Sequence, residues 1–189
     1  MFIAMSLLVP TSHAAEIVKL PEPDKTSGKP LMEVINTRKT GREFSKKALD
    51  EQTLSEILWA AYGSNNHGTR TIPTARNEQN LKVYAIMADG AWLYNGEKHQ
   101  LELVVKDDLR KLLAKQDYVK DAPLTIVYTG SNQEYSALHA GSSYQNVSLY
   151  AASKGLSAVV RGFFDKDEIK KALKLPKDEF AIITITVGY

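Results

Sequence analysis

Three cations and a hydroxyl group lie within five residues of one another early in the chain, at the end of a short predicted helix. These residues are Arg38, Lys39, Thr40 and Arg42. Guanidinium and ammonium groups bind phosphate through charge-assisted hydrogen bonds, so the segment predicts an anion site. A solvated basic turn contains the same residue types, because such clusters are common on protein surfaces. The segment by itself leaves both interpretations open.

A second candidate is the polar stretch from residue 63 to residue 77, which is too rich in Gly, Asn and Pro for a regular element. Loops of this length usually carry function. His67 lies within it, where a role as proton donor competes with a plain surface role. A surface role is the more common one for a loop histidine, so His67 is a weak candidate.

The composition excludes several other chemistries. The chain has no cysteine, which rules out disulfides, thiolate metal sites, thiol nucleophiles and iron-sulfur ligation. Its four histidines do not have the spacing of a metal site, and the chain has no Walker loop, dinucleotide fingerprint or GxSxG elbow. The formal net charge is +2, from 24 basic and 22 acidic residues mixed along the chain. This balance gives no broad field for nucleic acid or an anionic membrane.

The elements that must position these residues follow from periodicity and from helix start and stop signals. Helices are predicted from Leu31 to Arg38, from Asp50 or Thr53 to Gly63, from Asp107 to Leu113, from Glu134 to Lys154 and from Asp165 to Leu175. Gly155 is the predicted left-handed stop of the longest helix. Strands are predicted at 81–87, 92–94, 100–104, 123–129, 156–160 and 180–187, with Asn95-Gly96 as a hairpin turn.

Helices and strands interleave without the strict alternation of a Rossmann unit, which favours an α+β fold with a sheet flanked by helices. A length of 189 residues with 43% hydrophobic residues fits one domain. Small residues at helical spacing in the longest helix, such as Ala137, Gly141 and Ser148, allow another backbone to approach closely. We therefore expect a homodimer, since a monomer would leave apolar surface exposed.

The first residues have the pattern of a targeting segment. Phe2 to Val9 is a short apolar run, and Ser12-His13-Ala14 places small residues where a signal peptidase cleaves. Residues 1–14 are thus a predicted signal peptide of an exported, periplasmic protein, although the usual basic residue before the apolar run is missing. A leader that is not a signal peptide would leave the protein in the cytoplasm. Residues 15–30, with three prolines, are a predicted flexible leader, and the folded domain is predicted over 31–189.

Taken together, three segments resemble motifs of the nitroreductase-like FMN proteins, over residues 32 to 189. The first is Arg38 to Phe44, and the second is Pro73-Thr74-Ala75-Arg76-Asn77-Glu78-Gln79 before a strand. The third is the long helix with Gln145-Asn146 and its Gly155-Leu156 end, followed by Val160-Arg161-Gly162-Phe163. Each motif alone is weak, but their order and their distances along the chain are similar to those of the family.

The resemblance implies a nitroreductase-like fold with a central, mostly antiparallel sheet flanked by helices, in a dimer with FMN at its interface. It also implies an FMN-dependent oxidoreductase that exchanges hydride between a donor and a small organic acceptor through flavin N5. The backbone N–H of Arg161 or Gly162 would face N5, and no catalytic side chain is required. The implied cofactor-binding residues are Arg38, Lys39, Thr40, Arg42, Pro73, Thr74, Ala75, Asn77, Val160, Arg161 and Gly162.

Two departures from the family pattern limit what the resemblance implies. The chain ends at Tyr189, where many relatives continue with a further basic phosphate ligand, so the phosphate grip is expected to rest on Arg38, Lys39 and Arg42 alone. The insertion that shapes the substrate pocket in larger relatives is short here, so the sequence indicates neither the substrate nor the electron donor. Two alternatives are a flavin-binding protein without turnover and a surface interaction module without cofactor.

Overall fold

The computed structural model describes residues 16–189, and the predicted signal peptide lies outside these described residues. A single sheet of seven strands forms the centre, in the order β1-β4-β3-β2-β5-β7-β6, and every neighbouring pair is antiparallel. The strands are β1 (Ile17–Lys19), β2 (Lys82–Met87), β3 (Gly90–Asn95), β4 (Gln100–Val105), β5 (Leu124–Gly130), β6 (Ser157–Arg161) and β7 (Phe180–Gly188). The predicted α+β class with an antiparallel sheet is confirmed.

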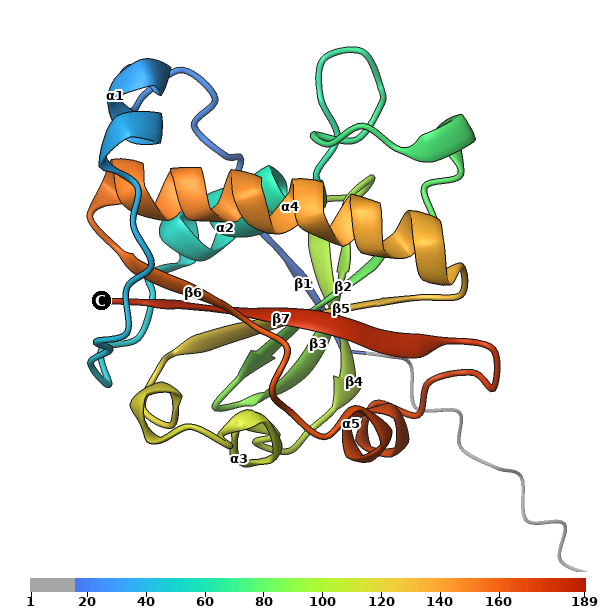
Figure 1. Ribbon diagram of the computed structural model, residues 1–189. Coiled ribbons are helices and arrows are strands. Elements are labelled where there is room, and N and C mark those ends of the chain that lie inside the picture. The colour runs from blue at the N-terminus through green and yellow to red at the C-terminus, as the bar shows by residue number, and fades with distance from the viewer. Residues whose placement is uncertain (1–15) are drawn as a thin grey trace, which may run out of the picture.

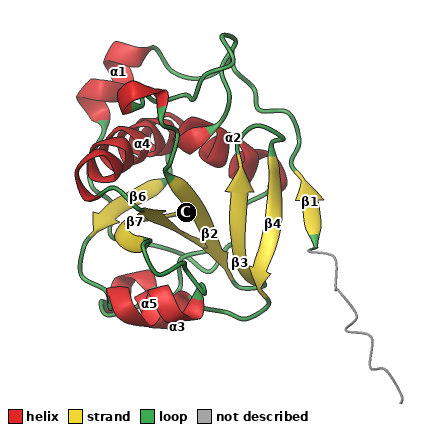
Figure 2. Ribbon diagram, turned by 90° about the vertical axis from the view of Figure 1, so that its right-hand side faces the viewer, coloured by secondary structure: helices red, strands yellow, loops and turns green. Residues whose placement is uncertain are grey.

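Helices cover both faces of this sheet, as Figures 1 and 2 show. The α-helices are α1 (Leu31–Thr37), α2 (Glu51–Tyr62), α3 (Arg110–Leu113), α4 (Gln133–Lys154) and α5 (Lys166–Ala172). Helices α2 and α4 lie on one face with α1 beyond them, and α3 and α5 lie on the other. Because both faces are covered, every residue of β5 is buried.

The core has two parts, one on each side of the sheet. Alternation along β5 separates them, since Ile126 and Tyr128 pack with α2 and α4 while Val127 packs with α3 and α5. On the first side, Val147 and Ala151 of α4 are almost fully buried. The small residues on this face of α4 therefore bring the helix close to the sheet within one chain. The small residues whose spacing predicts a dimer contact lie outside this buried face, since Ala137 is exposed and Gly141 and Ser148 are half-buried.

The ends of the two long helices follow their capping residues. Asp50 begins α2, and its carboxylate accepts a hydrogen bond from the N–H of Thr53 at 2.7 Å. Asn132 begins α4 in the same way, with a hydrogen bond from the N–H of Tyr135 at 3.0 Å. Gly155 ends α4 at φ 71°, a left-handed conformation that glycine adopts without steric cost.

Two predicted elements are different in the structure. The helix predicted from Asp107 is only one turn, Arg110–Leu113, because Asp108 uses its carboxylate on the N–H and the guanidinium of Arg110 instead of beginning a longer helix. In the β3–β4 hairpin, neither Asn95 nor Gly96 has a positive φ, and His99 adopts it at 50°. The Asn95 side chain accepts hydrogen bonds from the N–H groups of Glu97 and Lys98, at 3.2 and 3.1 Å, and so fixes a wider loop.

The expected flexible leader over residues 15–30 is instead joined to the folded domain. Strand β1 pairs with β4, and the N–H of Leu20 donates to the carbonyl of His99 at 3.1 Å. The carbonyl of Pro21 accepts a hydrogen bond from the hydroxyl of Ser55, at 2.5 Å, and lies 3.0 Å from Nε2 of His99. A strand of three exposed residues has no hydrophobic pattern, so its sequence resembles a linker.

This contact of β1 predicts a measurable loss of stability on truncation. A chain that begins at Pro21 should unfold at a lower temperature than one that begins at Glu16, because it lacks the β1–β4 hydrogen bonds and uncovers the edge of β4. Thermal unfolding followed by circular dichroism compares the two. Equal midpoints would show that residues 16–20 add nothing to the fold.

Candidate functional site

The predicted anion-binding segment, Arg38 to Arg42, follows α1 directly and lies against the start of β6. The N–H of Gly41 donates to the carbonyl of Ala158 at 3.0 Å, which fixes the segment to the strand. Arg38 is half-buried, and Lys39, Thr40 and Arg42 are exposed. The three cationic side chains make no ion pair or hydrogen bond with any of residues 16–189. They are therefore free to bind an anion.

The segment approaches β6 so closely that only glycine fits at its centre. A Cβ atom built on Gly41 would lie 2.9 Å from the Cα atom of Ser157 and 2.8 Å from its Cβ atom. A hollow of ≈ 250 Å³ lies beside this contact. Lys39, Gly41, Gly155 and Ser157 are among its lining residues. Lys39 of the turn and the end of α4 thus border one small cavity.

The other end of β6 carries the predicted backbone donor. Gly162 follows the last residue of the strand, and its N–H has no hydrogen-bond partner among the described residues. A Cβ atom built on Gly162 would meet nothing within 4 Å, so the backbone there faces open space. Arg161, in contrast, is still paired with Thr184 of β7. Of the two predicted donors, Gly162 is the one that lies beyond the strand pairing, with an N–H that has no partner among the described residues.

The side chain of Arg161 points away from this open space into the protein. It is 4% exposed, and it donates to the carbonyl of Leu113 at 2.9 Å and to the hydroxyl of Thr186 at 3.1 Å. Burial lowers the pKa of its guanidinium, which the nearby Tyr118 partly opposes. Only the backbone of Arg161 is therefore placed to face a ligand. Val160, the preceding residue, is half-buried and packs against the α4 side of the core.

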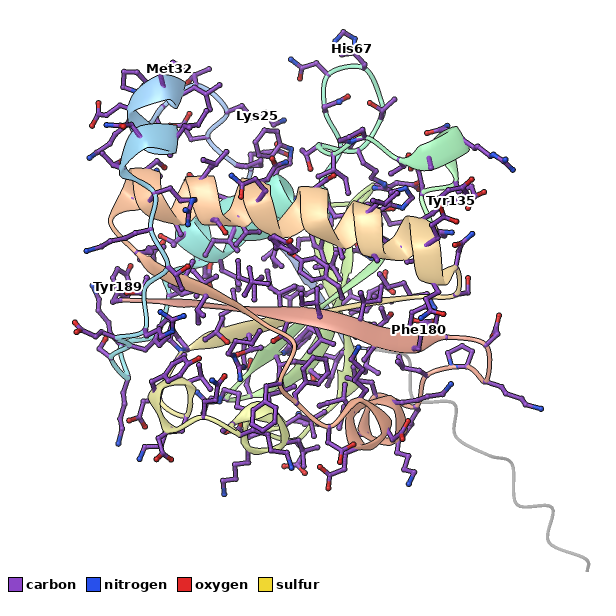
Figure 3. All side chains as sticks on the ribbon, in the orientation of Figure 1. Lys25, Met32, His67, Tyr135, Phe180 and Tyr189 are labelled. Atoms are coloured by element: carbon purple, nitrogen blue, oxygen red, sulfur yellow. The ribbon has the colours of Figure 1, made fainter. Side chains whose placement is uncertain are left out.

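The predicted segment Pro73 to Asn77 lies at the opposite end of α4. It includes a short 3-10 helix, Ala75–Asn77, and the N–H of Ala75 donates to Nε2 of His139 at 2.7 Å. Pro73 and Asn77 are exposed, and Thr74 and Ala75 are half-buried. Arg76 has its guanidinium 5.8 Å from the ring centroid of Tyr135 in the first turn of α4. Figure 3 shows Tyr135 at this end of the helix.

Within one chain the predicted site residues therefore form two groups. The basic turn and Gly162 lie along β6, whereas Pro73 to Asn77 lies beside the first half of α4. From His139 to Ala152, which lines the hollow by the turn, α4 rises about 20 Å at 1.5 Å per residue. A single chain does not bring the two groups together.

Two residues position the second group. Sequence reasoning gave His139 no role beyond the absence of metal-site spacing, and it named Asn146 only as part of the long-helix motif. His139 is 2% exposed and contacts the Pro73 segment directly. Asn146 holds the same loop further along, since its amide donates to the carbonyls of Ala60 and Thr71, each at 3.2 Å. Both lie on the α2-facing side of α4, and this helical spacing is the one sequence signal that could have linked them. His67 is exposed at the tip of its loop, as Figure 3 shows.

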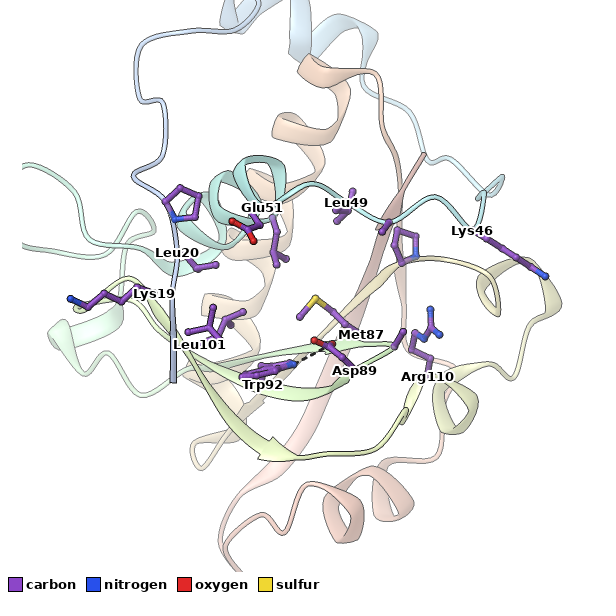
Figure 4. A pocket seen from close by; sticks show the side chains of 16 residues that line it. Lys19, Leu20, Lys46, Leu49, Glu51, Met87, Asp89, Trp92, Leu101 and Arg110 are labelled. Carbon is purple, nitrogen blue, oxygen red and sulfur yellow. Dashed lines mark hydrogen bonds between the residues drawn. The ribbon is translucent and has the colours of Figure 1, made fainter. Parts of the chain in front are cut away.

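A larger apolar cavity lies elsewhere and is not part of this site. It measures ≈ 380 Å³ and is bordered by β1, the start of α2 and the β2–β3 turn, with Met87, Trp92 and Leu101 among its lining residues (Figure 4). None of the predicted cofactor-binding residues lines it. Arg110 borders the cavity, but its guanidinium is paired with Asp108 at 2.7 Å. Within residues 16–189, no helix combines the length and the apolar character needed to cross a membrane.

Comparison with known proteins tests the family resemblance found in the sequence. The family model described as Nitroreductase family matches residues 35–189. A protein of Methanocaldococcus jannaschii that is provisionally named a nitroreductase is 29% identical to this chain over 180 residues. The match covers 84% of this chain and 90% of that protein. A crystal structure from Ralstonia eutropha JMP134 with a similarly provisional nitroreductase name superposes with a TM-score of 0.86. It is 38% identical, and the match covers 97% of this chain and 95% of that one.

More distant structures share the fold alone. A chain of the Escherichia coli microcin synthetase complex McbBCD has a TM-score of 0.71 at 16% identity, over 98% of this chain and 78% of that one. The family model covers most of the chain, and the Ralstonia structure matches it along nearly its full length. The chain belongs to the nitroreductase family.

Proposed function

We propose that the protein is an FMN-dependent oxidoreductase that binds one FMN in each of two sites between two copies of the chain. Membership of the nitroreductase family supports flavin-dependent oxidoreductase chemistry in general. The observation that carries the more specific proposal is the line of groups along β6. Free cations lie at the start of this strand, and a free backbone N–H lies at its end.

The groups at the start of β6 suit a phosphate. The side chains of Arg38, Lys39 and Arg42 have no partner among residues 16–189, and Lys39 lines a hollow that Gly41 and Gly155 also border. Free guanidinium groups bind phosphate oxygens in pairs, which favours an esterified phosphate over a neutral group. This arrangement distinguishes FMN from riboflavin, which has no phosphate.

The groups at the end of β6 suit the flavin ring. Gly162 lies five positions after Ser157, which corresponds to about 16 Å of extended strand at 3.3 Å per residue. The ribityl chain and ring of FMN extend over a comparable length. The unpaired N–H of Gly162 would donate a hydrogen bond to the ring, and the missing side chain lets the ring approach the backbone.

A second copy of the chain would complete each site. Two α4 helices related by a two-fold axis perpendicular to them would run antiparallel, so the His139 end of one would lie beside the Gly155 end of the other. The Pro73 to Asn77 segment of each copy would then cover the flavin held by the other. Exposed apolar side chains on this side of the chain support the pairing: Leu138 of α4 is 61% exposed, and Leu31 and Met32 of α1 are 62% and 74% exposed.

FMN, when bound, would accept a hydride from a donor and pass it to a small organic acceptor, such as a nitro compound or a quinone. The chain's own residues would bind and orient. The basic turn would hold the phosphate, Gly162 would donate a hydrogen bond that stabilises the reduced ring, and Val160 would contribute apolar surface beneath it. No side-chain acid or base is needed for hydride transfer itself.

The phosphate grip can be tested with R38A/R42A. Each lost charge-assisted hydrogen bond costs about 1.5–3 kcal/mol, so we expect the Kd for FMN to rise about 100-fold or more. Riboflavin should bind the variant and the parent chain equally, because it lacks the phosphate. Titration of apoprotein into FMN or riboflavin, followed by flavin fluorescence, measures both values.

The control for charge is K46A/K170A, which removes two cations that are not part of the proposed phosphate site. It should leave FMN affinity unchanged. An equal loss of affinity in both double variants would show that the effect is general electrostatics. If the purified parent chain bound neither flavin, and remained colourless with excess FMN, the proposal would be wrong.

The two-copy arrangement can be tested with L138D. A carboxylate at this exposed position would be buried against the second copy, so we expect a shift from dimer to monomer and a parallel loss of FMN binding. V18D is the control, since Val18 is 41% exposed on β1, at the edge of the sheet away from α4. Sedimentation velocity separates the outcomes. A dimer that survives L138D would contradict the proposed α4 contact.

A further inference from the structure

The segment from Pro73 to Gln79 has a backbone conformation that its own residues do not favour. Three of its residues have positive φ without being glycine: Arg76 at 52°, Asn77 at 55° and Gln79 at 44°. For side chains other than Asn this conformation costs free energy, so it persists only where surrounding contacts hold it.

Apart from a bond to the adjacent Asn80, only one hydrogen bond joins residues 73–79 to the rest of the described chain. The N–H of Ala75 donates to Nε2 of His139 at 2.7 Å, and the other hydrogen bonds of the segment are internal or reach its neighbour Asn80. The stacking of Arg76 on Tyr135 at 5.8 Å is a weaker second contact. The imidazole of His139 is therefore the main polar anchor of the segment.

This contact specifies the protonation state of the imidazole. A backbone N–H can only donate, so Nε2 must accept and must carry no proton. The neutral ring then has its proton on Nδ1, which is buried and has no hydrogen-bond partner among the described residues. A second proton has only Nε2 to bind. Protonation of His139 would therefore place an N–H against the N–H of Ala75 and abolish the hydrogen bond.

We propose that His139 is a positioning residue that makes FMN binding depend on pH: its neutral imidazole holds the Pro73 to Gln79 segment in place, and its protonation releases it. The proposal rests on the proposed function in one respect, namely that this segment covers the flavin of the second copy. The hydrogen bond to Ala75 is independent of that assumption.

The surroundings of the ring set the pH range. Burial lowers the pKa of His139 from the ordinary value of 6.5, and the carboxylate of Glu78 opposes this shift. Other ionisable groups on the adjoining elements are Arg76 of the segment, Glu134 and Tyr135 of α4, Tyr62 of α2, Tyr128 of β5, and the Lys82–Glu179 pair on the sheet. The neutral form thus predominates at neutral pH, and the segment is released as the pH falls below 6.5.

The test compares the parent chain with H139Q between pH 8 and pH 5. A glutamine carbonyl also accepts a hydrogen bond from the N–H of Ala75 but does not titrate. In the parent chain we expect the Kd for FMN to rise by up to about tenfold per pH unit below the pKa of His139, as for linkage to one proton. The phosphate of FMN itself binds a proton near pH 6. That effect is common to both proteins. The difference between their slopes of log Kd against pH therefore reports the protonation of His139.

A second readout needs no flavin. In the flavin-free full chain, the amide ¹⁵N and ¹H shifts of Ala75 should follow a single titration below pH 6.5, and H139Q should abolish it. Equal pH profiles of Ala75 and of FMN affinity in both proteins would overturn the proposal. So would an Ala75 titration with no matching change in affinity. Failure of the parent chain to bind FMN at pH 8 would instead refute the proposed function, and the Ala75 titration would still decide the role of His139.

Discussion

The packing of α4 across the sheet is the constraint on which the rest of the structure depends. Its buried face is made of small or short side chains, with Ala140, Ser143 and Ala151 at most 1% exposed. The hydroxyl of Ser143 donates to the carbonyl of Ala61 in α2 at 2.7 Å, which fixes the two helices against each other. A larger residue at these positions would push α4 off the sheet. The segments at its two ends would then lose their support.

One helix thus supports both halves of the candidate site and also keeps them apart. The Pro73 segment is attached near the start of α4 through His139, and the hollow beside the basic turn is bordered by Gly155 at its end. A rigid helix of 22 residues cannot bend to join them. In the proposed pair of copies, symmetry would solve this problem without any change of shape, since two antiparallel copies would place opposite ends of the helix together. The site would then be formed by assembly, and the single chain has exposed apolar side chains that such a contact would cover.

Local signals in the sequence were sufficient where the structure depends on neighbouring residues. Asp50 and Gly155 mark the ends of α2 and α4 because capping acts within one turn of helix. Strand β1 was mistaken for a linker, because three exposed residues gain their structure entirely from pairing with β4. The contact of His139 joins residues 64 positions apart, and no local pattern encodes it. The residues of the candidate site were named by resemblance to the family, and the structure adds which of their atoms are free.

Cations that could bind a phosphate differ from cations that stabilise the fold in whether their side chains already have partners. Their charge is the same. Arg161 carries the same guanidinium group as Arg38, and it is the last residue of β6, directly before Gly162. Its side chain is nevertheless committed to the carbonyl of Leu113 and the hydroxyl of Thr186, which offset part of the cost of burying a charge. The side chains of Arg38 and Arg42 have no such partners among residues 16–189. An anion near the start of β6 would therefore meet charges that the protein does not otherwise use.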